Sequence, residues 1–382
     1  MFSSALQEAT EIRISNNNKA AFALARRFES DILEALPSPD PVFGSEEGLA
    51  RQYATSRKTV RQALRILEAR SLGRMRRGAG GGLLLHVPDI KEVAAMMAIH
   101  LMAIGASVGD VLEARRQLEP VLDNGGAEGV TWARSIFETL LCEFEDAAPD
   151  IADTQNRALL IARRIARDCG RSRQSEGDAR IDTIEHLAER HATGPQVVLQ
   201  ALRVLEDLEL IEVQRGRNGG FVASTPSPAA IVRATYPYFV LSGMSVHCVH
   251  DVIWAINKVG ASQAALTMAR GQAIPLEVAL AGLTRQSVEE DAFVSQIAMW
   301  RVLADAADNK VLHVLVRCLF YYQMNAGLIS DEDNAAGRAE AASFLSGRIA
   351  RAVLAGNPVA AVDAVSRLEQ VSRGGNLSDS AA

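Results

Sequence analysis

The stretch Ser56-Arg57-Lys58-Thr59-Val60-Arg61-Gln62-Ala63-Leu64-Arg65-Ile66-Leu67-Glu68 carries two patterns at once. Its apolar residues recur every three or four positions, the spacing of one helical face. Arg57 and Arg61 are four residues apart and share another face of the same helix. Thr55 or Ser56 supplies the hydroxyl that caps a helix N-terminus. The stretch therefore predicts an amphipathic helix that continues through Ala69 and carries arginines on its outer face.

Two helices are expected before this stretch and a hairpin after it. Residues 20–36 have helical apolar spacing and are followed by Pro37 and Pro39, and Ser45-Glu46-Glu47 opens a short helix to about Tyr53. After Leu72, two extended runs, residues 73–77 and 83–87, flank a glycine-rich tip. Three helices with a tight turn between the second and third, followed by a hairpin, are typical of a winged helix-turn-helix unit.

Part of the stretch occurs twice. Gln62-Ala63-Leu64-Arg65-Ile66-Leu67-Glu68 returns as Gln200-Ala201-Leu202-Arg203-Val204-Leu205-Glu206, and the same offset aligns the flanking sequence without gaps. Residues 47–88 and 185–226 share 18 identities in 42 positions, whereas average residue usage gives about two or three by chance. One residue out of register, Ala25-Arg26-Arg27-Phe28 aligns with Ala162-Arg163-Arg164-Ile165. The sequence therefore predicts a duplicated unit, here called the first repeat and the second repeat.

Cations gather on the third helix and hairpin of the first repeat. Nine Lys and Arg residues lie between Arg51 and Arg77 and are opposed only by Glu68, although the whole chain has a net charge of −6. Arginine suits bidentate reading of guanine, and small hydroxyls, lysine and glycine suit phosphate contact. A solvated basic face is the alternative. The location favours a DNA interface made of Ser56, Arg57, Lys58, Thr59, Arg61, Arg65, Arg76, Arg77 and Gly80.

The second repeat has lost this charge. Pro195, Gln196 and Leu199 stand where the first repeat has Arg57, Lys58 and Arg61, and acidic residues outnumber basic ones between Glu189 and Arg217. Pro195 is compatible with a first helical turn. Two interpretations remain open: an auxiliary DNA contact through Arg215 and Arg217, and a retained packing module. The charge balance favours the packing module.

The first repeat resembles the DNA-binding domain of GntR-family bacterial transcription regulators in three segments: Ser45-Glu46-Glu47-Gly48-Leu49-Ala50, Ser56-Arg57-Lys58-Thr59-Val60-Arg61-Gln62-Ala63-Leu64 and the glycine-rich hairpin. This resemblance implies a cytoplasmic regulator in which Arg57 and Arg61 contact the operator. Glu47 stands where the family often has arginine, so a third contact is not implied there.

The rest of the chain resembles the helical ligand-sensing (FCD) domain of the FadR-like subfamily. Residues 300–312 and 348–361 look like two of its late helical segments, and residues 108–120 look like its opening helix. The resemblance implies a homodimer that docks on two half-sites, as a repressor or an activator, and a small acid-like metabolite as effector. Whether two chains pair through their first repeats, or one chain with two repeats takes the place of a dimer, stays open. Trp300, Ser346 and Leu368 fall where many members place metal-binding histidines, so no metal or other cofactor is expected.

The expected fold is mainly α-helical with small β-hairpin wings: two winged helix-turn-helix domains plus an α-helical bundle that senses a ligand. The expected boundaries are an N-terminal tail at 1–18, the first winged helix at 19–88, a truncated FCD-like segment at 89–150, a degenerate second winged helix at 151–226, an FCD-like effector and dimerisation domain at 227–374 and a C-terminal tail at 375–382.

Polar and aromatic residues of the last domain are candidates for the effector site: His247, His250, Trp254, Asn257, Trp300, Arg301, Tyr321 and Tyr322. Aromatic residues on helices also serve as plain core, which is the alternative. His247, His250 and Asp251 have a spacing that could hold a metal from one helix, but three local groups need a further ligand, and a polar helix start explains them as well.

Other functional classes have little support. The sequence has no Gly-x-Ser-x-Gly elbow, phosphate loop or His-Glu-x-x-His motif, so no enzyme is expected. Four scattered cysteines and the lack of a signal-like start fit a reducing interior. The longest apolar stretch, residues 93–108, is shorter than the roughly 20 residues of a membrane span and predicts a buried helix instead. The remaining alternative is an interaction or sensor protein that has kept the fold and lost specific DNA reading.

Overall fold

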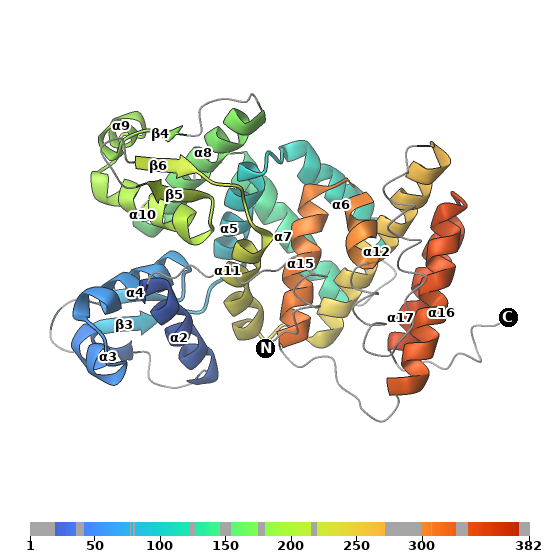
Figure 1. Cartoon of the computed structure of the whole chain (residues 1–382), viewed down its shortest axis with the longest axis horizontal. Coiled ribbons are helices and arrows are strands. Elements are labelled where there is room, and N and C mark those ends of the chain that lie inside the picture. Colours follow the sequence, from blue (N-terminus) through green and yellow to red (C-terminus); the bar gives the residue numbers. More distant parts are fainter. Residues whose placement is uncertain are drawn as a thin grey trace. The chain divides into compact units, whose positions relative to one another are not determined.

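A computed structural model describes residues 20–35, 42–76, 78, 81–122, 127–145, 154–174, 180–214, 220–271, 299–306, 308–325 and 335–373. These residues are mainly helical, with two small antiparallel sheets (Figure 1). The chain divides into two compact units. The repeat unit comprises Ile14–Val108 and Ser135–Met244, and the helical unit is built mainly from Gly109–Arg134 and Ser245–Ala382.

The first repeat contains the three expected helices and the expected hairpin. The helices are α2 (Ala20–Ala35), α3 (Glu46–Gln52) and α4 (Arg57–Ala69), and the hairpin strands are β2 (Gly73–Arg76) and β3 (Gly82–Leu85). Side chains from all three helices fill its core, among them Phe28, Leu49, Val60, Leu64 and Leu67. The helical spacing of apolar residues in the sequence therefore identified the buried faces.

A third strand, β1 (Val42–Gly44), was not expected from the sequence. It pairs antiparallel with β3, so the strand order is β1-β3-β2. Three residues are too few to show the alternation that marks a strand. The two strands approach closely at Gly82, where an added Cβ would lie 2.4 Å from the carbonyl oxygen of Gly44. A glycine is therefore needed at that position.

The second repeat has the same order of elements. Its helices are α8 (Thr154–Gln174), α9 (Ile184–Arg190) and α10 (Pro195–Asp207), and its strands β4 (Arg180–Ile181), β5 (Ile211–Gln214) and β6 (Gly220–Ala223) pair in the order β4-β6-β5. The offset that aligns Gln62 with Gln200 also relates the bounds of α3, α4, β2 and β3 to those of α9, α10, β5 and β6. The repeat seen in the sequence is thus also a repeat of elements.

Unusual backbone conformations recur at the same offset. Ala54 and Ala192 have φ values of 48° and 46°, and Ser71 and Glu209 have φ values of 57° and 56°. Left-handed backbone is uncommon for residues other than glycine. Ala54 and Ala192 lie in the turn before α4 and α10, and Ser71 and Glu209 follow these helices. The chain therefore turns in the same way in both repeats.

A helix follows each repeat, again at the same offset: α5 (Ile90–Ala103) and α11 (Pro228–Leu241). An Asp89–Glu92 capping box starts α5, and residues 93–103 are all buried, as the apolar stretch predicts. The helix packs against α8 at Gly170, where an added Cβ would lie 2.1 Å from the carbonyl oxygen of Met102. No single helix among the described residues is long and apolar enough to span a membrane. Helix α5 and the next helix, α6 (Val108–Leu122), reach that length and apolar composition only when they are taken together, and the chain bends sharply between them.

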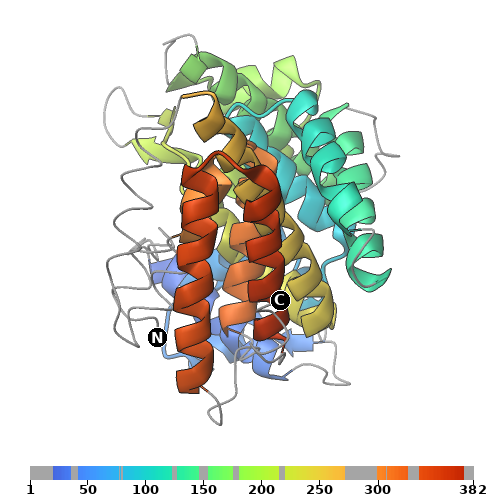
Figure 2. The ribbon, with the colours of Figure 1, turned by 90° about the vertical axis from the view of Figure 1, so that its right-hand side faces the viewer.

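The helical unit contains α6 (Val108–Leu122), α12 (Val246–Ala269), α15 (Lys310–Asn325), α16 (Ala335–Leu354) and α17 (Pro358–Ser372), while α7 (Ala127–Phe144) contributes its first turns. Figure 2 shows α16 and α17 side by side. They are joined by a tight turn in which Gly356 has a φ of 65° and Asn357 caps α17. Side chains of α12, α16 and α17 form a shared core around Trp254, Ile349 and Val365.

Candidate nucleic-acid interface

Helix α4 separates a buried face from a cationic one. Ser56 caps it: its Oγ accepts a hydrogen bond from the amide of Thr59 at 3.1 Å. The apolar residues Val60, Ala63, Leu64, Ile66 and Leu67 are buried. The cationic residues of the helix and its cap, Ser56, are exposed, and Thr59 is half-buried. The predicted site residues that α4 and its cap bring together are Ser56, Arg57, Lys58, Thr59, Arg61 and Arg65.

The angle between α2 and α3, which lead into α4, is held by contacts of Tyr53. The Tyr53 hydroxyl hydrogen-bonds the carboxylate of Asp31 on α2, and the Arg27 guanidinium lies 5.3 Å from the centre of the Tyr53 ring. The ring also packs edge-on against Phe28, with centroids 4.7 Å apart. These contacts hold the end of α3 against α2, a few residues before α4 begins.

Arg61 is engaged by a carboxylate in this structure. Its Nε and Nη2 donate to Glu46 at the start of α3, with the shortest N–O distance 2.8 Å. The hydrogen bond from Arg61 holds the pKa of Glu46 below its ordinary value. The sequence identified Glu46 only as a first-turn acid, because its partner lies on a different helix.

Arg70 does not belong to the cationic surface. The sequence count placed it there, but its side chain is buried and pairs with Glu29 and, at 2.8 Å, with Asp207. Burial lowers the pKa of the guanidinium, and the carboxylates of Asp207 and Glu29 more than offset this, so Arg70 stays charged. Arg70 is therefore structural: it links the first repeat to α10 of the second.

The structure describes only part of the hairpin of the first repeat. Arg74 and Arg76 are exposed on β2, the strand that leads from α4 into the hairpin. Four other predicted contacts, Arg77, Gly80, Arg215 and Arg217, lie outside the described residues.

The second repeat has uncharged residues at the positions that match Arg57, Lys58 and Arg61 of α4. Pro195 occupies the first turn of α10, as expected, and Gln196 is exposed beside it. Gly194 stands at the N-cap and offers no side-chain hydrogen bond, whereas Ser56 does so in α4. The equivalent helix has therefore lost its cap and the three cations of its first two turns, and it keeps Arg203, which matches Arg65.

The predicted effector residues fall into different surroundings. Trp254 and Trp300 are buried in the core of the helical unit and pack edge to face, with ring centroids 5.5 Å apart. Asn257 and Tyr322 are also buried, His250 is half-buried with its Nε2 2.6 Å from Nε2 of Gln323, and His247 is exposed. Arg301 and Tyr321 are half-buried. The aromatic pair is thus part of the core.

Two of the three side chains considered for a metal, His250 and Asp251, have other contacts. Asp251 accepts a hydrogen bond from Arg373 at 2.6 Å. Burial lowers the pKa of His250, and Arg373 and His247 lower it further. In the part of the chain that the structure describes, no three His, Cys, Asp or Glu side chains gather closely enough to hold a metal ion.

Comparisons with known proteins give only weak likeness. No family model matches the chain. No curated protein matches it either. A solved structure from Streptococcus agalactiae, described as GntR, overlaps with 56% of this chain and all of its own chain, at 18% identity and a TM-score of 0.38. A likeness at this level identifies neither the function nor the family, so the site is interpreted from its own residues.

Proposed function

We propose that this chain is a sequence-specific DNA-binding transcription regulator of the GntR type, with a FadR-like effector domain. The observation that carries the proposal is the exposed row of cations on α4, which continues onto β2 as Arg74 and Arg76. A helix with a free outer face and arginines near its N-terminus suits the major groove, and a neighbouring basic strand suits the phosphate backbone. The first repeat is then a winged helix-turn-helix unit that binds double-stranded DNA.

We propose further that the second repeat is a duplicated winged helix kept as an internal partner. Its helix α10 packs against α4, and Arg70 of the first repeat pairs with Asp207 where these helices end. The equivalent residues Arg65 and Arg203 line the same small hollow between the two helices. The pKa of Arg203 is lowered, mainly by burial and in addition by the positive charge of Arg65. Such a pairing supports a single chain that holds two winged helices in a fixed arrangement.

Modulation by a small metabolite in the helical unit is the remaining part of the proposal. Asn257 supports it, because its buried Nδ2 has no hydrogen-bond partner among the described residues. A buried unsatisfied donor costs free energy that a ligand with an acceptor would recover. Assembly into a homodimer belongs to the same proposal and is tested by sedimentation with and without DNA.

Binding to DNA is tested by fluorescence anisotropy with labelled fragments from upstream of the gene. Arg57→Ala and Arg61→Ala are each expected to weaken specific binding about tenfold or more, because each removes a candidate base contact. Gln196→Ala changes the position in α10 that matches Lys58 and serves as the matched control, with no expected effect.

Two results would contradict this function. One is a lack of any sequence-preferring complex at moderate salt, which would favour an interaction or sensor protein that has lost DNA reading. The other is equal loss of binding in Gln196→Ala and the α4 variants, which would show that the cationic face of α4 is not the interface.

A further inference from the structure

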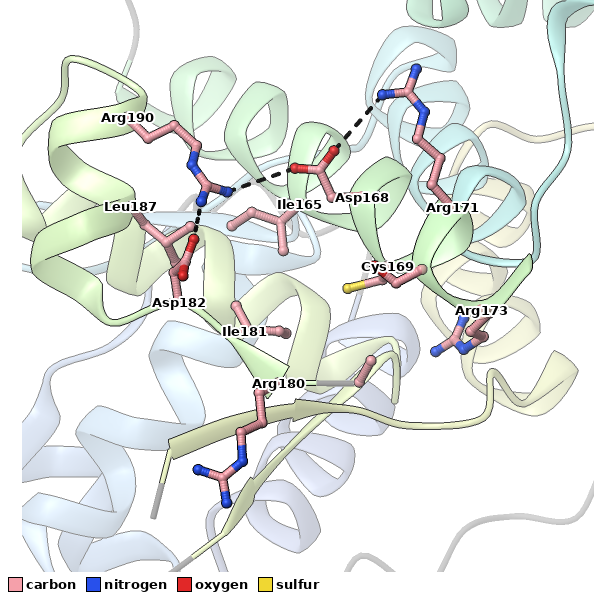
Figure 3. Close-up of a pocket in the computed structure, with 12 residues that line it drawn as sticks. Ile165, Asp168, Cys169, Arg171, Arg173, Arg180, Ile181, Asp182, Leu187 and Arg190 are labelled. Atoms are coloured by element: carbon pink, nitrogen blue, oxygen red, sulfur yellow. Dashed lines mark hydrogen bonds and ion pairs between the residues drawn. The ribbon is translucent and has the colours of Figure 1, made fainter. Parts of the chain in front are cut away.

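The second repeat has a cavity of about 360 Å³ that is open to solvent and lies between α8, α9, β4 and β6 (Figure 3). This volume lies within the range of roughly 300–1,000 Å³ that is usual for small-molecule sites. Its apolar walls include Ile165, Ile181 and Leu187, and Cys169 lies beside them. All lining residues belong to the repeat unit, so the cavity is a property of this fold alone.

Comparison of the two repeats explains why the cavity exists. In the first repeat, Phe28 packs edge-on against both Phe43 and Tyr53, with ring centroids 5.4 and 4.7 Å apart. The equivalent positions in the second repeat hold Ile165, Ile181 and His191. Three aromatic rings have thus been replaced by two smaller aliphatic side chains and an imidazole. Removing side-chain volume from a packed interior leaves space when the surroundings do not collapse.

The replacement of Tyr53 by His191 also changes the polar contacts next to the cavity. Asp31 hydrogen-bonds Tyr53 in the first repeat, whereas its counterpart Asp168 faces arginines instead, 3.9 Å from Arg190 and 4.0 Å from Arg171. The Nε2 atom of His191 is buried and has no hydrogen-bond partner among the described residues. Polar groups therefore replace the sealed aromatic cluster next to the cavity.

Charge at the cavity favours an anion. Four arginines and two aspartates line it, and Figure 3 shows both aspartates joined to arginines at one end, with Arg173 beside Cys169. The Arg173 guanidinium is fixed by the carbonyl oxygens of Ala103, at 2.5 Å, and Ser224. No carboxylate pairs with Arg173 in the described part of the chain, and burial lowers its pKa. A partly buried cation without a counter-ion is costly, and a bound anion would remove that cost.

We propose that this cavity binds a small organic carboxylate whose apolar portion lies against Ile165 and Ile181 and whose carboxylate pairs with Arg173. The second repeat would then be a ligand-binding module made from a DNA-reading fold, at a site separate from the effector site proposed in the helical unit. Binding requires no DNA, so this inference stands or falls independently of the proposed function.

Isothermal titration of the full chain tests the proposal with hexanoate and benzoate as probes and with hexanamide and benzamide as their uncharged counterparts. The carboxylates are expected to bind at least tenfold more tightly than the amides. Arg173→Met keeps the apolar stem and removes the charge, and Ile165→Phe with Ile181→Phe restores the aromatic residues of the first repeat and fills the space. Each change is expected to weaken carboxylate binding at least tenfold. Arg74→Met, which removes one exposed arginine from the first repeat, is expected to leave binding unchanged.

Circular dichroism and thermal unfolding establish that each variant is folded. Should the double substitution fail to fold, Ile181→Phe alone and Arg173→Met carry the test. The proposal is overturned by equal affinity for acids and amides, by unchanged carboxylate binding in a folded Arg173 or isoleucine variant, or by a lack of binding of either acid at concentrations of about 10 mM, where even weak sites with millimolar Kd fill.

Discussion

At the scale of single residues, Glu46 forms an ion pair with Arg61 that would compete with DNA at the proposed interface. The pair is exposed, with about half of the Arg61 side chain accessible, so its bonds exchange readily with solvent and ions. A phosphate approaching Arg61 would also meet the negative charge of Glu46. Under the proposed function, the carboxylate would oppose DNA binding in two ways, by pairing with the arginine and by repelling the phosphate backbone.

Glu46→Gln is accordingly expected to raise DNA affinity, by up to about fivefold, the limit that exposed ion pairs suggest. Anisotropy titrations measure the change. Glu47→Gln is the matched control, because Glu47 is the next residue of the same first helical turn and does not contact Arg61. Lower affinity in Glu46→Gln would show instead that Glu46 orients Arg61 for contact.

Glu29, Arg70 and Asp207 form a buried cluster of paired charges. The second repeat has Ala166 and Leu208 where the first has Glu29 and Arg70, and the first has Ala69 where the second has Asp207. Arg70→Leu leaves two buried carboxylates without their partner and is expected to cost about 3–5 kcal/mol of unfolding free energy. The triple variant Glu29→Ala, Arg70→Leu and Asp207→Ala is expected to recover most of this, as measured by urea denaturation.

The loss in Arg70→Leu should depend on pH. Burial raises the pKa of Glu29, and Arg70 is the main influence that opposes this rise. Without Arg70 the folded-state pKa rises further above the unfolded value, so the folded protein binds more protons and its stability falls as pH increases. The deficit relative to wild type is therefore expected to be smaller at about pH 4 than at about pH 7. A deficit independent of pH would show that Glu29 is not left charged and buried.

At the scale of elements, α4 and α10 are built alike but start differently. Both N-cap residues are extended, with φ and ψ of −75° and 145° at Ser56 and −76° and 149° at Gly194. A side chain at Gly194 would meet nothing within 4 Å. Only the hydroxyl is therefore missing from the start of α10.

Gly194→Ser should stabilise the protein by about 0.5–1 kcal/mol, through the added cap and the reduced freedom of the unfolded chain. Ser56→Gly should destabilise it by a similar amount. Both changes are read as shifts in the denaturation midpoint, and opposite signs are expected. A destabilising Gly194→Ser would mean that the hydroxyl adds nothing to the existing hydrogen bond from the amide of Val197 to the carbonyl oxygen of Gly194, 3.0 Å long.

At the scale of the whole molecule, charge is segregated. A chain with a net charge of −6 carries a patch of exposed arginines on α4 and β2. DNA binding through this patch should weaken steeply with salt, because each phosphate contact contributes a slope of about −0.9 to a plot of log affinity against log salt. Arg74→Ala with Arg76→Ala is expected to reduce the slope by about two.

The double variant should weaken binding to all sequences alike, since phosphate contacts carry no base information. Arg116→Ala with Arg351→Ala removes two exposed arginines from the helical unit and controls for net charge. An equal reduction of the slope in both double variants would contradict a localised interface.

Patterns within one element decided what could be predicted. Spacing, caps and composition within a single helix or hairpin predict the helices of both repeats, the hairpins and the buried stretch of α5. They also predict the loss of cations from the start of α10. Strands as short as β1 and β4 carry no such pattern. The pairing of Arg61 with Glu46 and the burial of Arg70 could not be anticipated either, because their partners are distant in the sequence.

The sequence by itself determined the repeat, the order of its elements and the helix face that carries the cations, because these depend on local periodicity and on side-chain type. Only the tertiary structure decided which of those cations are available and where space is left. Arg70 is buried in ion pairs with Glu29 and Asp207, which belong to other helices, and the cavity is lined by two replacements, Ile165 and Ile181, that are distant in the sequence. Burial and packing arise from contacts between elements, and no single segment encodes them.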